Sequence, residues 1–194
     1  MHNQPIGLLI PEADNTIYTR FNRFGNGEII DMTENFTVVT AGIDQLRRQC
    51  RTLVLATVDE GNTPLASQTP FVMNASNEFL VLVSGLAEHG RNLKTSAHAG
   101  IMLLQDEAGL VNPFARERLN YRCQVRAMLR DTKEWRDGEQ FFRQRFGKFV
   151  DTLLQLPDFA MYCLKPLEGR YVAGFGAAYK LTGDEIQAIG PPTK

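Results

Sequence analysis

Hydrophobic and polar positions alternate most regularly between residues 119 and 129. One set comprises Leu119, Tyr121, Cys123, Val125, Ala127 and Leu129, and the other comprises Asn120, Arg122, Gln124, Arg126 and Met128. A period of two is the repeat of a β-strand with one buried face. The pattern therefore predicts a strand over residues 119–129, with the Leu119 set facing the core and the two arginines facing outward.

Six further segments have the apolar, β-branched composition of strands and are separated by turn residues. They cover residues 53–58, 64–73, 79–83, 100–104, 159–164 and 170–179. Pro64 and Pro70 restrict the second of these to an edge or a bulge. Seven sequential antiparallel strands favour closure into a small β-barrel, because closure removes exposed strand edges. The predicted fold is mainly β (α+β), with a few short helices and one longer helix.

Helical spacing of apolar residues is clearest after Thr132, which is placed to cap a helix. The apolar stripe that follows, interpreted as core, consists of Trp135, Phe142, Phe146, Phe149 and Leu153. Its intervals predict one long helix with a single buried side. Shorter helices are predicted over 40–49, where Thr40 supplies the cap, and over 85–96, and a helical turn is predicted over 114–117.

The polar, asparagine-rich segment before Thr40 differs from the rest of the chain. Residues 1–40 are predicted to form an N-terminal appendage, with a small hairpin around the Asn26-Gly27 turn signal. Residues 41–186 form the predicted barrel domain. Residues 187–194 form a short C-terminal tail.

The 21 basic and 22 acidic residues leave a formal net charge of −1. Nonspecific nucleic-acid binding needs a strong cationic field, so no nucleic-acid partner is expected. No apolar run reaches the length of a membrane span, so neither a membrane partner nor a signal peptide is expected. Cys50, Cys123 and Cys163 are widely spaced and form no C-x-x-C pair, which favours free thiols in a cytoplasmic protein.

Basic residues are concentrated between positions 116 and 148, which hold ten of them against five acidic residues. Such a surplus is explained by solvated faces of a strand and a helix. It is explained equally well by a surface that faces an anion. Both interpretations stay open at the level of the sequence.

The chain contains no G-x-G-x-x-G, P-loop, H-E-x-x-H or G-x-S-x-G motif. His89 and His98 are the histidines available for acid–base chemistry or metal ligation. His89 shares the predicted helix 85–96 with Arg91 and Asn92, and Ser84 lies just before it. A helix start with several donors can hold a phosphate or a carboxylate, although surface or packing roles explain these residues as well.

Three motifs occur together: L-A-E-H-x-R-N-L from Leu86, L-x-D-F from Leu156, and G-F-G-x-A-Y from Gly174. With their flanking residues they resemble the haem-iron utilisation (HugZ-type) branch of the pyridoxamine 5′-phosphate oxidase-like, FMN-binding split barrels. The resemblance covers residues 41–186. It implies a split-barrel homodimer with ligand clefts at the subunit interface, and a role in binding haem or degrading it oxidatively.

Haem, the favoured ligand, needs an apolar slot, cations for two propionates and an axial iron ligand. Arg143 and Arg145 of the long helix are candidates for the propionates, with a solvated helix face as the alternative. The resemblance places Asp158 of the L-x-D-F motif near the iron ligand, as the catalytic candidate; an ordinary turn aspartate is the alternative.

In the family branch the axial ligand is a histidine beyond the last strand, whereas residues 187–194, QAIGPPTK, contain none. Ligation is then expected from a side chain elsewhere in the chain. The candidates are His89, His98, Cys163 and Tyr179, of which we select His89 as the metal ligand.

FMN is the alternative cofactor. The wider family holds its phosphate with basic residues on the second strand and at the start of the short helix. Here residues 66–72 contain neither Lys nor Arg, and Glu88 stands among the positions where a basic cluster is expected. The phosphate would then be held by Ser84, His89, Arg91 and Asn92. The hypotheses are therefore a haem-binding, haem-degrading protein, an FMN-dependent oxidoreductase, and a barrel that binds haem or flavin without catalysis.

Overall fold

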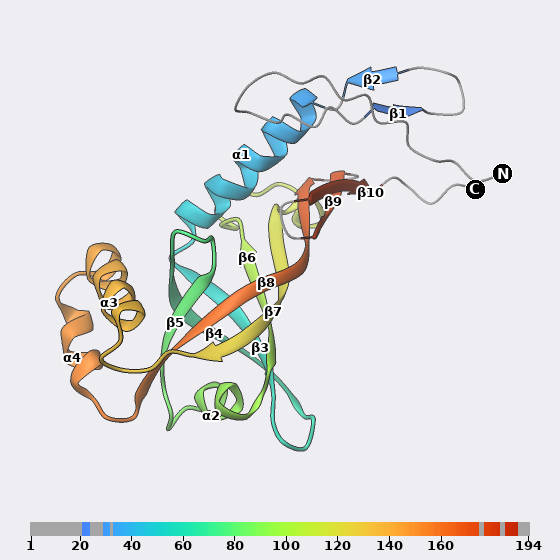
Figure 1. Cartoon of the computed structure of the whole chain (residues 1–194). Coiled ribbons are helices and arrows are strands. Elements are labelled where there is room, and N and C mark those ends of the chain that lie inside the picture. Colours follow the sequence, from blue (N-terminus) through green and yellow to red (C-terminus); the bar gives the residue numbers. More distant parts are fainter. Residues whose placement is uncertain (1–20, 24–28, 32, 175–176, 183–184, 190–194) are drawn as a thin grey trace. The chain divides into compact units, whose positions relative to one another are not determined.

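The computed structural model describes residues 21–23, 29–31, 33–174, 177–182 and 185–189, and Figure 1 labels its elements. The chain divides into two compact units, residues 1–44 and residues 45–194. The first contains β1 (Phe21–Arg23) and β2 (Ile29–Asp31), which pair antiparallel. The Asn26-Gly27 turn signal between these strands lies outside the described residues.

The helix α1 (Thr33–Gln49) crosses the boundary between the units and is longer than predicted. Its predicted start at Thr40 is wrong, since Thr40 is an exposed residue inside the helix. Residues 33–39 contain no proline or glycine that would stop the helix before Thr40. A threonine beside an apolar repeat resembles a cap even where the helix continues past it.

Six strands of the second unit form a closed antiparallel barrel (Figure 1). They are β3 (Thr52–Val58), β4 (Pro64–Met73), β5 (Phe79–Ser84), β6 (His98–Leu104), β7 (Arg118–Ala127) and β8 (Phe159–Gly174). Around the barrel their order is β3, β4, β5, β8, β7 and β6, and β6 pairs with β3. The predicted fold class, a split β-barrel with a few helices, is confirmed.

The long strand β8 replaces the two strands predicted over 159–164 and 170–179. The prediction of two strands is wrong because Pro166 lies inside a continuous strand, opposite Cys123, where the β7–β8 register shifts by one residue. Proline is tolerated in a sheet at such a bulge. β9 (Ala177–Thr182) and β10 (Glu185–Ile189) extend the sheet beyond β8.

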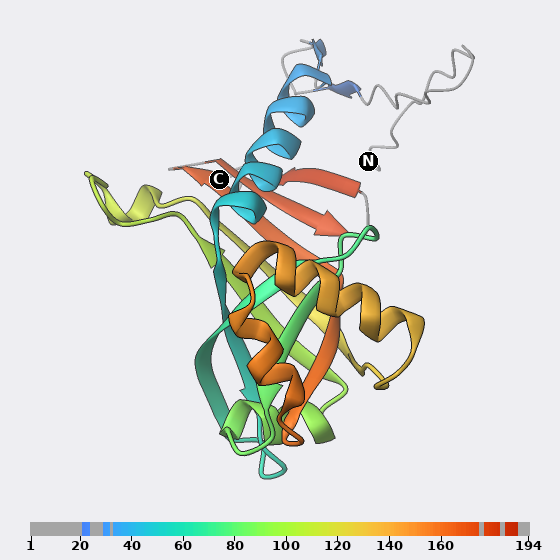
Figure 2. The same cartoon turned by 90° about the vertical axis from the view of Figure 1, so that its left-hand side faces the viewer.

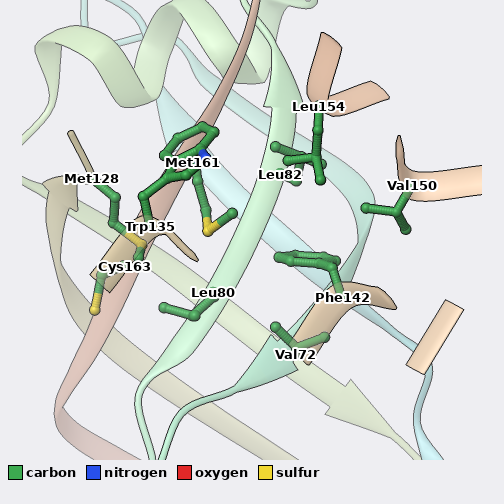
Figure 3. Packing of buried hydrophobic residues seen from close by; sticks show 10 residues of the cluster. All are labelled: Val72, Leu80, Leu82, Met128, Trp135, Phe142, Val150, Leu154, Met161 and Cys163. Carbon is green, nitrogen blue, oxygen red and sulfur yellow. The ribbon is translucent and has the colours of Figure 1, made fainter. Parts of the chain in front are cut away.

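β5 is buried on both faces, and this divides the apolar interior into two parts. Phe79 points into the barrel, where its ring centroid lies 5.4 Å from that of Phe71 and 6.0 Å from that of Tyr121. Leu80 and Leu82 point to the opposite face, into the cluster of Figure 3. The buried members of this outer cluster are Val72, Leu80, Leu82, Met128, Trp135, Phe142, Val150, Leu154, Met161 and Cys163.

Two helices, α3 (Lys133–Phe146) and α4 (Phe149–Gln155), cover the outer cluster on one side of the barrel (Figure 2). The single long helix predicted here is broken at Gly147, whose φ of 79° ends α3 in the left-handed conformation that glycine favours. Trp135 and Phe142 are buried as the apolar stripe predicts. Phe149 is 71% exposed, because it follows the break.

The end of β7 departs from the predicted alternation. Met128, predicted to face outward, is buried in the outer cluster, and Leu129 is 73% exposed. β7 ends at Ala127, so the strand repeat no longer decides which side these two residues face.

The helix predicted over 85–96 and the helical turn predicted over 114–117 both form close to these positions. α2 (Glu88–Thr95) packs against β3 and β5 at one end of the barrel (Figure 1). The turn η1 (Pro113–Ala115) is capped by Asn112, whose Oδ1 accepts a hydrogen bond from the backbone N–H of Phe114 at 3.0 Å. In the described part of the chain, every helix is too short or too polar to span a membrane.

Two phenylalanines of the predicted stripe test this packing. Phe142→Ala removes a ring that is 2% exposed, and we expect a loss of about 3–5 kcal/mol in the free energy of unfolding. Phe149→Ala removes a ring that is 71% exposed, and we expect a loss of less than about 1 kcal/mol. Urea unfolding of both variants measures the difference. Equal losses would contradict the separation of α3 and α4 at Gly147.

Candidate functional site

A groove of about 680 Å³ lies on the outer face of the barrel, where β3, β6, β7 and β8 adjoin. We call it the outer-face groove. Its walls combine small and apolar residues with a few polar ones, an arrangement typical of small-molecule sites. The lining consists of Ala56, Thr57, Val58, Pro64, Ser96, His98, Ala99, Gly100, Arg122, Leu167 and Glu168.

Small side chains keep the floor of the groove low. Ala56 of β3 and Gly100 of β6 are directly opposite each other in the strand register. A Cβ atom added at Gly100 would lie 3.3 Å from the Cβ of Ala56, closer than ordinary packing. The sequence alone did not show this feature, because the two residues are 44 positions apart and meet only through strand pairing.

The polar residues of the groove lie along its edge. His98, at the start of β6, is exposed, and its backbone carbonyl accepts a hydrogen bond of 2.7 Å from Ser96 Oγ. Arg122 of β7 and Glu168 of β8 form an ion pair of 2.6 Å between Nη1 and Oε1. The groove therefore offers an imidazole and a paired guanidinium beside its apolar walls.

Asn92, a predicted phosphate donor, supports the wall of the groove instead of facing solvent. It is buried, and its Nδ2 donates a hydrogen bond of 3.0 Å to Oγ1 of Thr57, which is also buried. A buried amide and a buried hydroxyl satisfy each other here. Through Thr57, α2 fixes the end of β3 that lines the groove.

Ser84 and Asp158 come together at the start of α2, as neighbouring members of the predicted site. Ser84 Oγ donates a hydrogen bond of 2.5 Å to Asp158 Oδ2, and the backbone N–H of Gly85 donates to the Asp158 carbonyl at 2.6 Å. Ser84 Oγ also accepts from the backbone N–H of Leu86 at 3.1 Å. Both the side chain and the backbone of Asp158 are thus held by residues 84–85.

The rest of the predicted donor cluster is engaged within α2 and its first turn. Arg91 is exposed, and its Nη1 donates to the backbone carbonyl of Leu86 at 2.5 Å. His89 is half-buried, and burial lowers the pKa of its imidazole. Gly90 packs so closely that an added Cβ would lie 2.0 Å from the Ser84 carbonyl oxygen. This close contact fixes α2 against the residue that holds Asp158.

A further residue, which sequence reasoning missed, holds the loop that carries Asp158. The Arg130 guanidinium donates to the carbonyls of Leu154 at 2.9 Å, Leu156 at 3.0 Å and Phe159 at 2.7 Å. It also lies over the Trp135 ring, 4.7 Å from its centroid. One arginine therefore closes the end of α4 and fixes both flanks of Asp158.

The structure places Arg143 and Arg145 away from this cluster. The Arg145 guanidinium donates to the carbonyls of Arg48 and Cys50 and lies 5.1 Å from the centroid of Phe71. Cys50 precedes β3, whereas Thr57, the partner of Asn92, is seven residues further on, or roughly 23 Å along an extended strand. The two predicted groups of site residues thus lie at opposite ends of the barrel.

Most of the basic side chains between residues 116 and 148 bind other groups of the same chain. Arg143 pairs with Asp151 at 2.5 Å, Lys133 pairs with Asp137 at 2.6 Å, and Arg126 pairs with Glu134. The carboxylate of Glu134 raises the pKa of Arg126 by hydrogen bonding, and the reverse interaction lowers the pKa of Glu134. Half of the ten basic residues thus form ion pairs, which contribute little stability individually, and four others donate to backbone carbonyls.

The remaining candidate iron ligands are less accessible than His98. Cys163 is 2% exposed, its Sγ donates to Glu78 Oε2 at 3.3 Å, and burial raises its thiol pKa to about 12. The Tyr179 ring stacks on that of Tyr171, with centroids 6.2 Å apart. The described residues contain no cluster of three or more His, Cys, Asp or Glu side chains suited to a metal ion.

Comparison with known proteins connects this barrel to a family. A family model of pyridoxamine 5′-phosphate oxidase matches residues 39–173. Heme oxygenase HutZ from Vibrio cholerae serotype O1 is 39% identical over 144 residues, which cover 74% of this chain and 81% of that protein.

Solved structures show the same relationship. The structure of HutZ from Vibrio cholerae, described there as a heme storage protein, is 36% identical and superposes with a TM-score of 0.63 over 66% of this chain and 89% of that one. Campylobacter jejuni ChuZ is 26% identical and superposes with a TM-score of 0.75 over 82% of this chain and 67% of that one.

Two arginines of α3 test which side chains hold the fold. Arg145→Ala removes hydrogen bonds from a charged donor to two carbonyls, and we expect a loss of about 2 kcal/mol in the free energy of unfolding. Arg143→Ala breaks exposed ion pairs only, and we expect a loss of less than about 1 kcal/mol. Urea unfolding measures both. An Arg145→Ala variant as stable as the unaltered chain would show that its guanidinium is dispensable for folding.

Proposed function

The chain belongs to the pyridoxamine 5′-phosphate oxidase family, and on that premise we propose that it is a haem-binding protein of the haem-iron utilisation type. The observation that carries the proposal is the outer-face groove, where an exposed imidazole stands beside apolar walls. The similarity to a relative described as a heme oxygenase and a heme storage protein supports it.

The residues of the groove fit the chemistry of haem. Ala56, Val58 and Leu167 offer an apolar surface for the macrocycle, and the small residue Gly100 leaves room above the sheet. Haem also needs cationic partners and an axial ligand, and the groove contains Arg122 and His98. Bound haem would supply a redox-active iron at which dioxygen can react.

Among the candidate ligands, His98 is the one that the groove favours. It lines the groove and is exposed, whereas His89 lies on α2, outside the groove lining. Cys163 is held as a neutral thiol by burial, and a thiol must lose its proton before it binds a metal. We therefore propose that the imidazole of His98, and not that of His89, would bind the haem iron.

Oxidative haem degradation belongs to this proposal as its catalytic part. Asp158 is the candidate for handling protons; it lies at the start of α2, outside the lining of the outer-face groove, and Ser84 fixes its Oδ2 through the 2.5 Å hydrogen bond. Arg130 restricts the loop on either side. These contacts hold the carboxyl group in one orientation, as acid–base catalysis requires.

A homodimer is also part of the proposal. Val58 and Leu167, 38% and 41% exposed, border the outer-face groove, and a second copy of the chain would cover them. A ligand in the groove would then lie at the subunit interface.

Absorption spectra test the proposed ligand. Haemin added to the purified chain is expected to give a shifted, saturable Soret band, and FMN added separately is expected to give no bound-flavin spectrum. His98→Ala should move the Soret maximum and weaken haemin binding about tenfold or more, because it removes the axial ligand.

His89→Ala is the matched control, since it removes the other described imidazole and should leave the Soret band unchanged. A Soret shift in His89→Ala but not in His98→Ala would identify His89, on α2, as the iron ligand. Bound-flavin bands without a haem response would replace haem by FMN as the ligand.

Sedimentation velocity tests the dimer. We expect the chain to sediment as a dimer of 21.8 kDa subunits at micromolar concentration. A Leu167→Glu variant should dissociate it, because a carboxylate would be buried at an apolar contact. A monomer of the unaltered chain would contradict the interface.

A further inference from the structure

A second hollow, of about 470 Å³, adjoins the outer-face groove. The two share Arg122 and Glu168, so one begins where the other ends. The other residues that line it are Asn120, Gly169, Arg170 and Lys180. We call it the basic hollow, because three of its six residues are cationic and one is acidic.

Strand register places the cations of the basic hollow side by side. Arg170 of β8 is directly opposite Asn120 of β7 on one side and Lys180 of β9 on the other. Directly opposed residues in antiparallel strands have Cα atoms about 5 Å apart, and like charges in such positions repel. Gln187 of β10 follows Lys180 in the same register, so this row across four strands contains no acidic residue.

The nearest acid does not compensate these charges. Glu168 is paired with Arg122 at 2.6 Å. Arg170 and Lys180 are exposed, and neither side chain makes an ion pair or a side-chain hydrogen bond with another residue in the described ranges. Among the side chains that the structure describes, these two positive charges therefore lie next to each other without an ion-pair partner, an arrangement that favours an anion between them.

Gly169 lets β7 and β8 approach each other closely next to these cations. A Cβ atom at this position would lie 2.4 Å from the Asn120 carbonyl oxygen and 2.4 Å from Cδ1 of Tyr121. The strands β7 and β8 approach closely here because glycine has no side chain. Its missing side chain would face the buried Tyr121, so Gly169 lines the hollow through its backbone.

We propose that Arg170 and Lys180, together with the amide of Asn120, bind the two propionate carboxylates of a haem whose macrocycle lies in the outer-face groove. The assignment rests on the proposed function and adds the residues that recognise the acidic edge of the ligand. It moves the propionate site from Arg143 and Arg145, which are bound to Asp151 and to backbone carbonyls, to another side of the barrel.

The continuity of the two hollows supports this assignment. Haem has an apolar ring and two acids on one edge, and the chain presents an apolar groove that leads into a basic hollow. Carboxylates and guanidinium or ammonium groups form strong charge-assisted hydrogen bonds. A phosphate group carries similar charge, so the phosphate of FMN is the other source that the experiment must separate.

The test compares haemin with its dimethyl ester, in which both propionates are uncharged. We expect the unaltered chain to bind haemin about tenfold or more tightly than the ester, measured by Soret titration. The double variant Arg170→Gln/Lys180→Gln should lose this preference and bind the two ligands equally. Its ester affinity should match that of the unaltered chain, which shows that the groove itself is intact.

Lys133→Gln/Arg136→Gln is the matched control. This variant also removes two positive charges, but from exposed positions of α3 that lie outside both hollows. It should retain the preference for haemin. Thermal unfolding of both double variants checks folding. Relief of the opposed charges predicts that Arg170→Gln/Lys180→Gln unfolds at the same or a higher temperature than the unaltered chain.

The outcomes separate the two claims. Equal binding of haemin and ester by the unaltered chain, or a preference that persists in Arg170→Gln/Lys180→Gln, overturns the propionate site and leaves haem binding in place. No binding of either porphyrin overturns both proposals. FMN binding that is lost in the same double variant, without porphyrin binding, assigns the hollow to a phosphate and also overturns the propionate assignment.

Discussion

The pairing of β7 with β8 is the constraint on which the rest of the structure depends. Ten residue pairs join these strands across a register shift, and they close the barrel that β3, β4, β5 and β6 leave open. Closure gives every barrel strand two neighbours, so backbone N–H and C=O groups are paired around the full circumference. The same ladder brings Arg122 opposite Glu168 and Asn120 opposite Arg170, residues that are about 50 positions apart in the chain.

The outer surface of the barrel is organised by that register. On one side, α3 and α4 cover β5 and β8 and bury the outer cluster, and arginines fix the ends of these helices by donating to backbone carbonyls. On another side the sheet carries Ala56 and Gly100, whose small side chains leave the outer-face groove. Charge follows the same division. The arginines near the helices bind other groups of the chain, whereas Arg170 and Lys180 beside the groove form no ion pair within the described residues.

Local pattern was enough to find most of the barrel strands. The limits of β4 are those predicted, and β3, β5 and β6 agree within two residues, because alternation and turn residues are local signals. The errors have tertiary causes. Pro166 is accommodated by a bulge that depends on β7, and Gly147 divides the predicted long helix so that α4 can bury its Val150 and Leu154 in the outer cluster. Composition shows that a glycine is present, but the contacts of the folded chain decide whether it breaks an element.

The amino-acid sequence was sufficient to predict the barrel, the helix over residues 85–96 and the proximity of Ser84 to a donor-rich turn, since each follows from periodicity or from neighbours in the chain. The motif resemblance pointed to Asp158, and the tertiary structure brought that residue onto Ser84. Only the tertiary structure decided which polar groups are committed: Asn92 to Thr57, Arg145 to backbone carbonyls, and Arg130 to the loop around Asp158. The positions of the outer-face groove and of the basic hollow also depend on the tertiary structure, because residues of different strands line both. The physical reason is that hydrophobic patterning specifies which face of a strand is buried, whereas strand register specifies which side chains meet on the other face.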